Sequence, residues 1–189
     1  ATAGTTETAL ETGPVGLWDR GAGVEVRMIS GTFSAASKAR VLGGANAIAI
    51  GDGDVWEVLQ FTDAELIATD TYRLTGLLRG QAGSDAVMPG AWPEGSWVVA
   101  LNGVPRQLPL TPAQRGQERH YRVGPASQPI SDPAYTHHAR VFTGIGLRPL
   151  SPCHLRVAEA GGDITAGWIR RTRIDGDGWD GGDVPLGEE

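Results

Sequence analysis

The sequence predicts a mostly β protein, in which short antiparallel strands accompany one short helix. Twenty-eight glycines and twelve prolines among 189 residues argue against long helices and supply many turns. Several segments alternate apolar and polar residues, as strands with one buried face do. The pair Asn102-Gly103 favours a tight hairpin connection between two such strands.

The N-terminal part predicts an arm and then the one helix. Residues 1–16 are small and polar without periodicity, so we expect a flexible arm or linker there. Residues 34–42 predict a helix of two or three turns. Ser34 is its expected N-cap, and Gly43-Gly44 permits a left-handed exit.

Residues 55–83 predict a meander of three strands. Thr62-Asp63 and Thr69-Asp70 are turn-compatible pairs at the spacing of tight antiparallel connections. Strict alternation in the third strand places one set of side chains on each face: Tyr72, Leu74, Gly76 and Leu78 against Arg73, Thr75 and Arg79. Similar patterns predict further strands, at 24–30, 47–50, 97–101, 104–110, 120–123 and 139–142.

The same meander resembles a known protein family. It contains W-E-V-L-Q-F and then Y-x-L-x-x-L-L-R-G-Q-x-G, which is similar to tail-tip proteins of tailed phages and gene transfer agents. Within that group, the run resembles the very large baseplate hub protein called megatron. Further runs before and after the meander also resemble the family and occur in the same order as in it. They lie at 18–27, 44–53, 92–99, 120–127 and 169–179.

The resemblance implies a structural part of a DNA-delivery particle. Its implied partners are other tail or baseplate subunits, with a homotrimer in the full-length protein and assembly into a virion or gene transfer agent tail. It also implies a TIM-barrel-like domain suggestive of glycoside or cell-wall hydrolysis. This chain lacks the alternating β/α pattern of such a barrel, so we place it C-terminal to that domain.

We expect three segments in the chain. The arm at 1–16 precedes a β-rich tail-protein domain at 17–148, and residues 149–189 begin an incomplete unit that resembles a fibronectin type III β-sandwich. A proline opens that unit, and apolar side chains gather on one strand face: Leu155, Val157, Ile164, Ala166 and Trp168. A sandwich of this kind needs about seven strands. Alternatively, these strands complete the sheet of the preceding domain.

Charge and cysteine content restrict the function classes. The formal net charge of −6 lies entirely in the last sixteen residues, so we expect no direct nucleic-acid binding. No apolar run is long enough for a membrane helix, so we expect no membrane span. Cys153 is the only cysteine, which excludes an internal disulfide and agrees with synthesis in a reducing bacterial cytoplasm.

The sequence motifs predict no catalytic, cofactor or metal site in this chain. His137 and His138 are adjacent, so an extended backbone points them to opposite faces. The acidic run at 175–180 departs from a calcium loop, because Trp179 takes a ligand position. Carboxylates within the meander, at Glu57, Asp63, Glu65 and Asp70, are expected to face solvent.

Six tryptophans suggest a second role, because flat aromatic rings stack on sugars. Three lie within predicted strands and are expected to fill the core: Trp56, Trp97 and Trp168. Three lie in loops rich in glycine or proline and are candidate glycan or partner contacts: Trp18, Trp92 and Trp179.

Three function classes follow from these observations. We favour a structural interaction module of a phage-like tail tip or baseplate that takes part in DNA delivery to a host cell. The alternatives are a module that binds envelope polysaccharide through its loop tryptophans, and an accessory domain of a cell-wall hydrolase.

Overall fold

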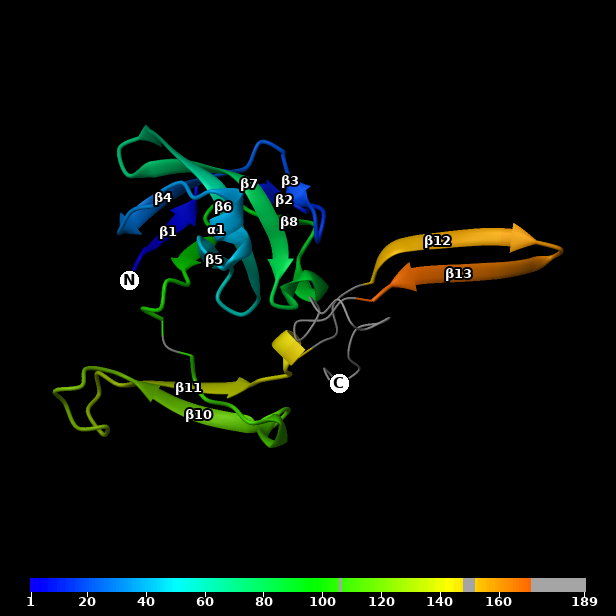
Figure 1. Ribbon diagram of the computed structural model, residues 1–189. Coiled ribbons are helices and arrows are strands. Elements are labelled where there is room, and N and C mark those ends of the chain that lie inside the picture. The colour runs from blue at the N-terminus through cyan, green and yellow to red at the C-terminus, as the bar shows by residue number, and fades with distance from the viewer. Residues whose placement is uncertain (106, 148–151, 171–189) are drawn as a thin grey trace. The chain divides into compact units, whose positions relative to one another are not determined.

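The computed structural model describes residues 1–105, 107–147 and 152–170, and the chain divides into two compact units (Figure 1). The first unit spans 1–107 and the second 108–189. The predicted boundary between residues 148 and 149 lies outside the described residues. The prediction of a mostly β protein with antiparallel sheets and one short helix is confirmed.

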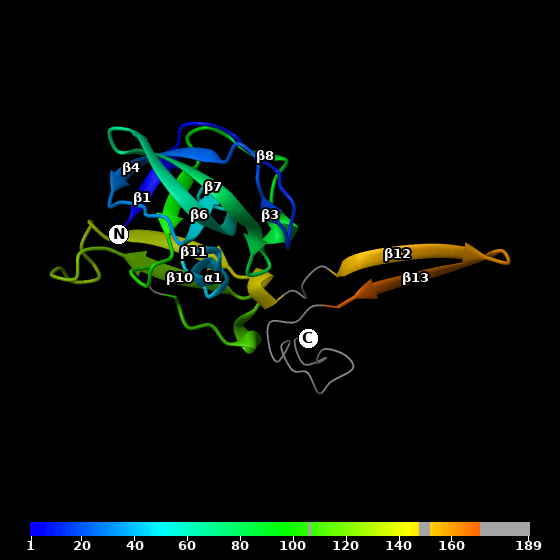
Figure 2. The ribbon, with the colours of Figure 1, turned by 45° about the horizontal axis from the view of Figure 1, so that its top comes forward.

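The first unit is a barrel-like antiparallel sheet (Figures 1 and 2). Seven strands follow the order β3-β7-β4-β1-β9-β5-β6, and β7 also pairs with β6, which closes six of them into a ring. Two further short strands, β2 and β8, pair with each other. The bounds are β1 Ala3–Thr6, β2 Leu10–Glu11, β3 Trp18–Asp19, β4 Val24–Ser30, β5 Ala47–Gly51, β6 Trp56–Ala68, β7 Thr71–Gln81, β8 Ala91–Trp92 and β9 Trp97–Ala100.

The expected flexible arm contains a central strand, so that prediction is wrong for residues 3–6. β1 lies between β4 and β9, with Ala3 opposite both Ser30 and Val99. A side chain at Gly4 would overlap the backbone of β4 at Arg27. Glycine is therefore required at position 4, and the sequence Ala3–Thr6 carries no hydrophobic alternation that could reveal a strand.

The helix is shorter than predicted. α1 covers Lys38–Leu42, and its N-cap is Ser37, whose hydroxyl accepts from the Arg40 amide at 3.4 Å. The preceding residues stay extended because their backbone bonds elsewhere: the Ala36 amide donates to the Thr62 carbonyl of β6 at 2.8 Å. The left-handed residue after the helix is Gly44, with φ 97°.

The predicted meander is one long hairpin of two strands. The turn at Thr69-Asp70 is confirmed, whereas Thr62-Asp63 lies inside β6. Strict alternation in β7 is wrong as well, because Leu74 and Leu77 both face the core. The change of phase falls at Gly76, which has φ 62° and no room for a side chain beside Thr62.

The core of the barrel consists of apolar side chains from every strand of the ring except β1, together with one side chain each from β2 and β8. It comprises Leu10, Val24, Val26, Met28, Ile48, Ile50, Leu59, Phe61, Leu74, Leu77, Trp92, Val98 and Ala100. Phe33, Ala64 and Tyr72 pack against this core from partly buried positions.

The second unit contains two separate antiparallel hairpins. β10 Glu118–Val123 pairs with β11 Thr136–Val141, and β12 Cys153–Ala160 pairs with β13 Asp163–Ile169. The predicted strand at 104–110 is not a strand in its described residues, because Pro105 and Pro109 lack the amide that pairing needs.

Single 3₁₀ turns occur in both units. In the first unit η1 covers Ser84–Val87, and in the second unit η2 covers Pro112–Gln114 and η3 covers Ile145–Leu147.

The β12–β13 hairpin carries the apolar residues that predicted a sandwich. Val157 pairs with Ala166, which places them on one face of the ladder. Trp168 was expected to fill a core, but its side chain is 55% exposed, so that prediction is wrong in the described residues. The fibronectin type III resemblance remains a prediction.

Candidate functional site

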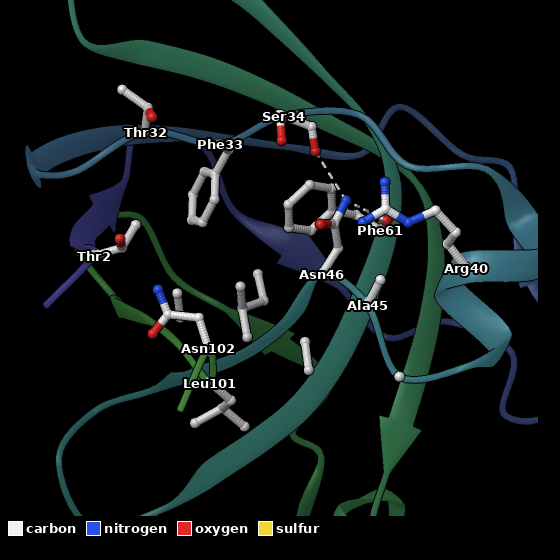
Figure 3. Close-up of a pocket in the computed structure, with 14 residues that line it drawn as sticks. Thr2, Thr32, Phe33, Ser34, Arg40, Ala45, Asn46, Phe61, Leu101 and Asn102 are labelled. Carbon is white, nitrogen blue, oxygen red and sulfur yellow. Dashed lines mark hydrogen bonds between the residues drawn. The ribbon is translucent and has the colours of Figure 1, made fainter. Parts of the chain in front are cut away.

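A pocket of about 320 Å³ opens in the first unit, where β5 begins and β9 ends (Figure 3). Five chain segments meet there: the N-terminus at Thr2, the stretch from Thr32 to Ser34, the end of α1 with the loop that leads into β5, Phe61 of β6, and residues 100–102. No single stretch of sequence contains the pocket.

Asn46 holds two of these segments together. Its side-chain amide donates to the Ser34 carbonyl at 2.9 Å and to the Phe61 carbonyl at 3.2 Å. Its backbone is left-handed, with φ 55°, a conformation that asparagine tolerates better than most residues. Both amide hydrogens are therefore used for structure, and the side-chain oxygen is left on the pocket side (Figure 3).

The floor of the pocket is apolar and rigid. Ile48, Phe61 and Ala100 are buried and belong to the barrel core. Phe33 lies beside them and meets Phe61 edge to face, with ring centroids 5.2 Å apart. The second edge-to-face contact of Phe33, with Tyr72 at 6.0 Å, fixes the ring between two partners.

The rim is polar and carries one charge. Arg40 of α1 is the only charged residue that lines the pocket, and its guanidinium extends from α1 toward Asn46 (Figure 3). Among the described residues, no carboxylate lies within ion-pair distance of Arg40. Asn102 faces it from the opposite wall; its oxygen accepts weakly from the Val104 amide at 3.4 Å, which leaves its amide group to the pocket.

A second polar cluster lies at the other end of β5 and is closed to solvent. Glu57 and Arg79 are both 0% exposed and form a bidentate pair across β6 and β7. Arg79 Nε donates to Glu57 Oε1 at 2.7 Å, and Nη2 donates to Oε2 at 2.9 Å. The Gly80 amide and the Trp92 indole also donate to this carboxylate, at 3.0 and 2.7 Å.

Arg79 uses its remaining donors on Met88 and on the N-terminal segment, and its Nη2 donates to the Met88 sulfur at 3.5 Å. Its Nη1 donates to the Glu11 carbonyl at 2.7 Å and lies 3.7 Å from Asp19 Oδ2. A side chain at Gly13 would crowd both Arg79 and Asp19. The guanidinium thus ties the β6–β7 hairpin to residues 11–19.

This cluster has no capacity left for acid-base chemistry. The carboxylate accepts four hydrogen bonds and has no exposed surface, so it has no path to a substrate. The expectation that Glu57 faces solvent is wrong, whereas Asp63, Glu65 and Asp70 are exposed as predicted.

The exposure of several tryptophan side chains differs from the expectation. Trp92, a proposed glycan contact in a loop, is 3% exposed and donates to Glu57, so no ring face is free for stacking. Trp97, expected in the core, is 47% exposed. Trp18 is partly exposed and has Lys38 Nζ 5.5 Å from its ring centroid, while Trp179 lies outside the described residues.

The histidines of the second unit form a pair without a metal-binding set. His137 stacks on His120, with Nε2 and Nδ1 3.1 Å apart, and Glu118 lies 3.5 Å from the other nitrogen of His120. His138 pairs with Tyr121 in the neighbouring register position. No group of three or more His, Cys, Asp or Glu side chains that could hold a metal is found in the described ranges. The acidic run at 175–180 lies outside them.

Comparison with known proteins bears on the first unit. The model of the family described as Rcc01698-like, C-terminal, matches residues 1–99, which are just over half of the chain. The match ends within β9 and so covers every strand of the barrel. A search of curated proteins found no match. In the part of the chain that is described, no helix has the length and apolarity to cross a membrane.

Proposed function

The chain belongs to the Rcc01698-like, C-terminal family, and from this membership we propose that it is a structural component of a phage-like tail tip or baseplate. The family name hints at gene transfer agents, which is the group that the sequence motifs resemble. In this proposal the chain is made in the bacterial cytoplasm, joins other tail subunits and serves as an interaction module in DNA delivery. The family match over the whole barrel is the observation that carries the proposal.

The hairpin motif supports a scaffold role. The run that resembles tail-tip proteins forms β6 and β7, and its Glu57 and Arg79 bind each other inside the barrel. Its glycines allow the change of phase at Gly76 and the amide contact of Gly80. The residues that identify the family-like motif therefore serve to build the barrel.

We propose that this chain has no catalysis of its own. The one buried carboxylate among the described residues is fully occupied by structural donors. The hydrolase-accessory alternative places chemistry on other sequence, so it agrees with the same geometry. Incubation of the purified chain with peptidoglycan should release no reducing sugar ends, and measurable release would contradict this part.

The location of the chain provides the decisive experiment. Purified tailed particles from the producing cells should contain this polypeptide by mass spectrometry. Antibody against it, imaged by electron microscopy, should label the tip of the tail. Particles that lack the polypeptide, or label only on the capsid, would overturn the proposal. The major tail-tube subunit is the matched control, because its antibody should label along the tail.

A further inference from the structure

We propose that the pocket between Arg40, Asn46 and Asn102 binds a sugar unit that bears a carboxylate, such as a uronic acid residue of a polysaccharide. This inference goes beyond the proposed structural role, because a tail-tip scaffold needs no ligand pocket. It also relocates the glycan hypothesis, from loop tryptophans to a site at the mouth of the barrel.

The shape and polarity of the pocket suit a sugar ring. A pyranose has apolar C–H faces and a belt of hydroxyl groups. The pocket matches this with an apolar wall, in which the partly exposed Phe33 and Leu101 lie beside the buried Ile48, Phe61 and Ala100, and with a rim of hydroxyl and amide groups. A volume of about 320 Å³ accommodates one ring of this kind.

The hydrogen-bonding groups on the rim are complementary to hydroxyls. Asn46 offers a fixed acceptor, since its two amide hydrogens are held by Ser34 and Phe61. Asn102 offers a donor from the facing wall, since its oxygen is turned to Val104. A hydroxyl group both donates and accepts, so it satisfies either partner. The acceptor is also preorganised, which reduces the entropy lost on binding.

The charge of the pocket selects an anion. Arg40 is the only charged residue that lines the pocket, so the charge at the rim is positive. One planar guanidinium matches one carboxylate through two parallel hydrogen bonds. A single cation is a weak site for a doubly charged phosphate, and the absence of any lining carboxylate argues against a metal cation.

The test compares two sugars that differ only in the carboxylate. D-glucuronate and D-glucose are titrated into the full-length chain, and binding is followed by saturation-transfer NMR and calorimetry. We expect glucuronate to bind in the roughly millimolar range and glucose about tenfold more weakly. The substitution Arg40→Gln should lower the affinity for glucuronate about tenfold and so remove its preference over glucose.

Two further variants separate the site from general effects. Arg20→Gln removes an exposed arginine that does not line the pocket, so it should keep the preference for glucuronate. Asn102→Ala should lower the binding affinity for glucuronate and for glucose by a similar factor. It also provides an independent test if Arg40→Gln alters the fold, which the amide NMR spectrum would reveal.

Three results would overturn the proposal. Absence of binding by either sugar up to about 100 mM excludes a sugar site of useful strength. Equal binding of the two sugars, or a preference that survives Arg40→Gln, excludes the role of the guanidinium. The third result combines two observations: the original chain binds neither sugar, and particles that carry Arg40→Gln lose a protein partner. That result would assign the pocket to an acidic segment of the partner protein. The antibody labelling of particles is a separate measurement, so a negative sugar-binding result does not contradict the proposed structural role.

Discussion

The two ends of the barrel use polar side chains in opposite ways. At one end, Glu57, Arg79 and Trp92 satisfy one another in a cluster without exposed surface. At the other end, Arg40 and Asn102 surround an open pocket with groups that the fold leaves available. β5 connects the two ends, because it begins at the pocket and Ile50 near its end pairs with Glu57.

The difference shows how to separate structural from functional polar residues. A buried ion pair whose donors and acceptors are all matched specifies one arrangement of the chain and offers nothing to a ligand. A rim of unmatched groups above a rigid apolar floor contributes little to folding and can bind a partner. The family-like motif contains the buried ion pair, whereas no sequence motif identified the residues on the rim of the pocket.

The largest expected effect is at the closed end. Glu57→Ala leaves the Arg79 guanidinium buried without its partner, so we expect the free energy of unfolding to fall by about 3–5 kcal/mol. Urea unfolding of the full chain, followed by tryptophan fluorescence, measures this loss. Glu65→Ala is the control. Its carboxylate is exposed and lies 3.7 Å from Arg73, so its removal should lower the free energy by less than about 1 kcal/mol.

A double substitution sharpens the same comparison. Glu57→Leu with Arg79→Met replaces both charges by apolar groups, and we expect it to be more stable than the sum of the two single losses predicts. The recovery should be partial, because the Gly80 amide, the Trp92 indole and the Glu11 carbonyl lose their partners. Losses that simply add would show that the two side chains do not act as a pair.

The phase change in β7 is the next feature to test. Gly76→Ala introduces a side chain at φ 62° against Thr62, and we expect a loss of about 1–3 kcal/mol because the strand must readjust. Gly90→Ala is the control, since nothing lies near its side-chain position and its φ is not positive. Equal thermal unfolding midpoints for the two variants would contradict this account.

Two tryptophans provide a smaller and more specific contrast. Trp92→Phe removes the indole donor to Glu57 but keeps most of the apolar volume, so we expect a loss of about 1–3 kcal/mol. Trp97→Phe changes a half-exposed ring and should have little effect on the free energy of unfolding. The expectation fails if the variant at position 97 is the more destabilised of the two.

The smallest effect concerns pH. The amides of Val55 and Asp54 donate to Asp52 at 2.8 and 2.9 Å and hold the pKa of this exposed carboxyl below its ordinary value of 3.8. A lowered folded-state pKa adds stability that is present above 3.8 and lost as pH falls through the folded pKa. A carbon-13 NMR titration should place the Asp52 midpoint below 3.8, and a midpoint above it would contradict the turn geometry.

Sequence alone predicted the elements whose pattern is local. β4 and β5 were predicted because their apolar residues alternate or run together, and the turn at Thr69-Asp70 because its residue types favour it. β1 was missed because Gly4 and its neighbours pair through backbone, which leaves no periodic signal.

The candidate site was beyond prediction for a different reason. The pocket joins Thr2, Phe33, Asn46 and Asn102, which come together only when the barrel closes. Glu57 was misassigned because a carboxylate within an alternating strand is usually exposed. Its partner lies 22 residues away, and the phase change at Gly76 that accompanies Arg79's burial is invisible to a strict period of two.

One titration compares both ends of the barrel in a single experiment. Amide and indole resonances of the nitrogen-15-labelled chain are recorded while D-glucuronate is added. We predict shifts at Ser34, Asn46 and Asn102, with the Trp92 indole resonance unchanged. Movement of the Trp92 indole, or no movement at the pocket residues, would contradict the division between a sealed and an open end.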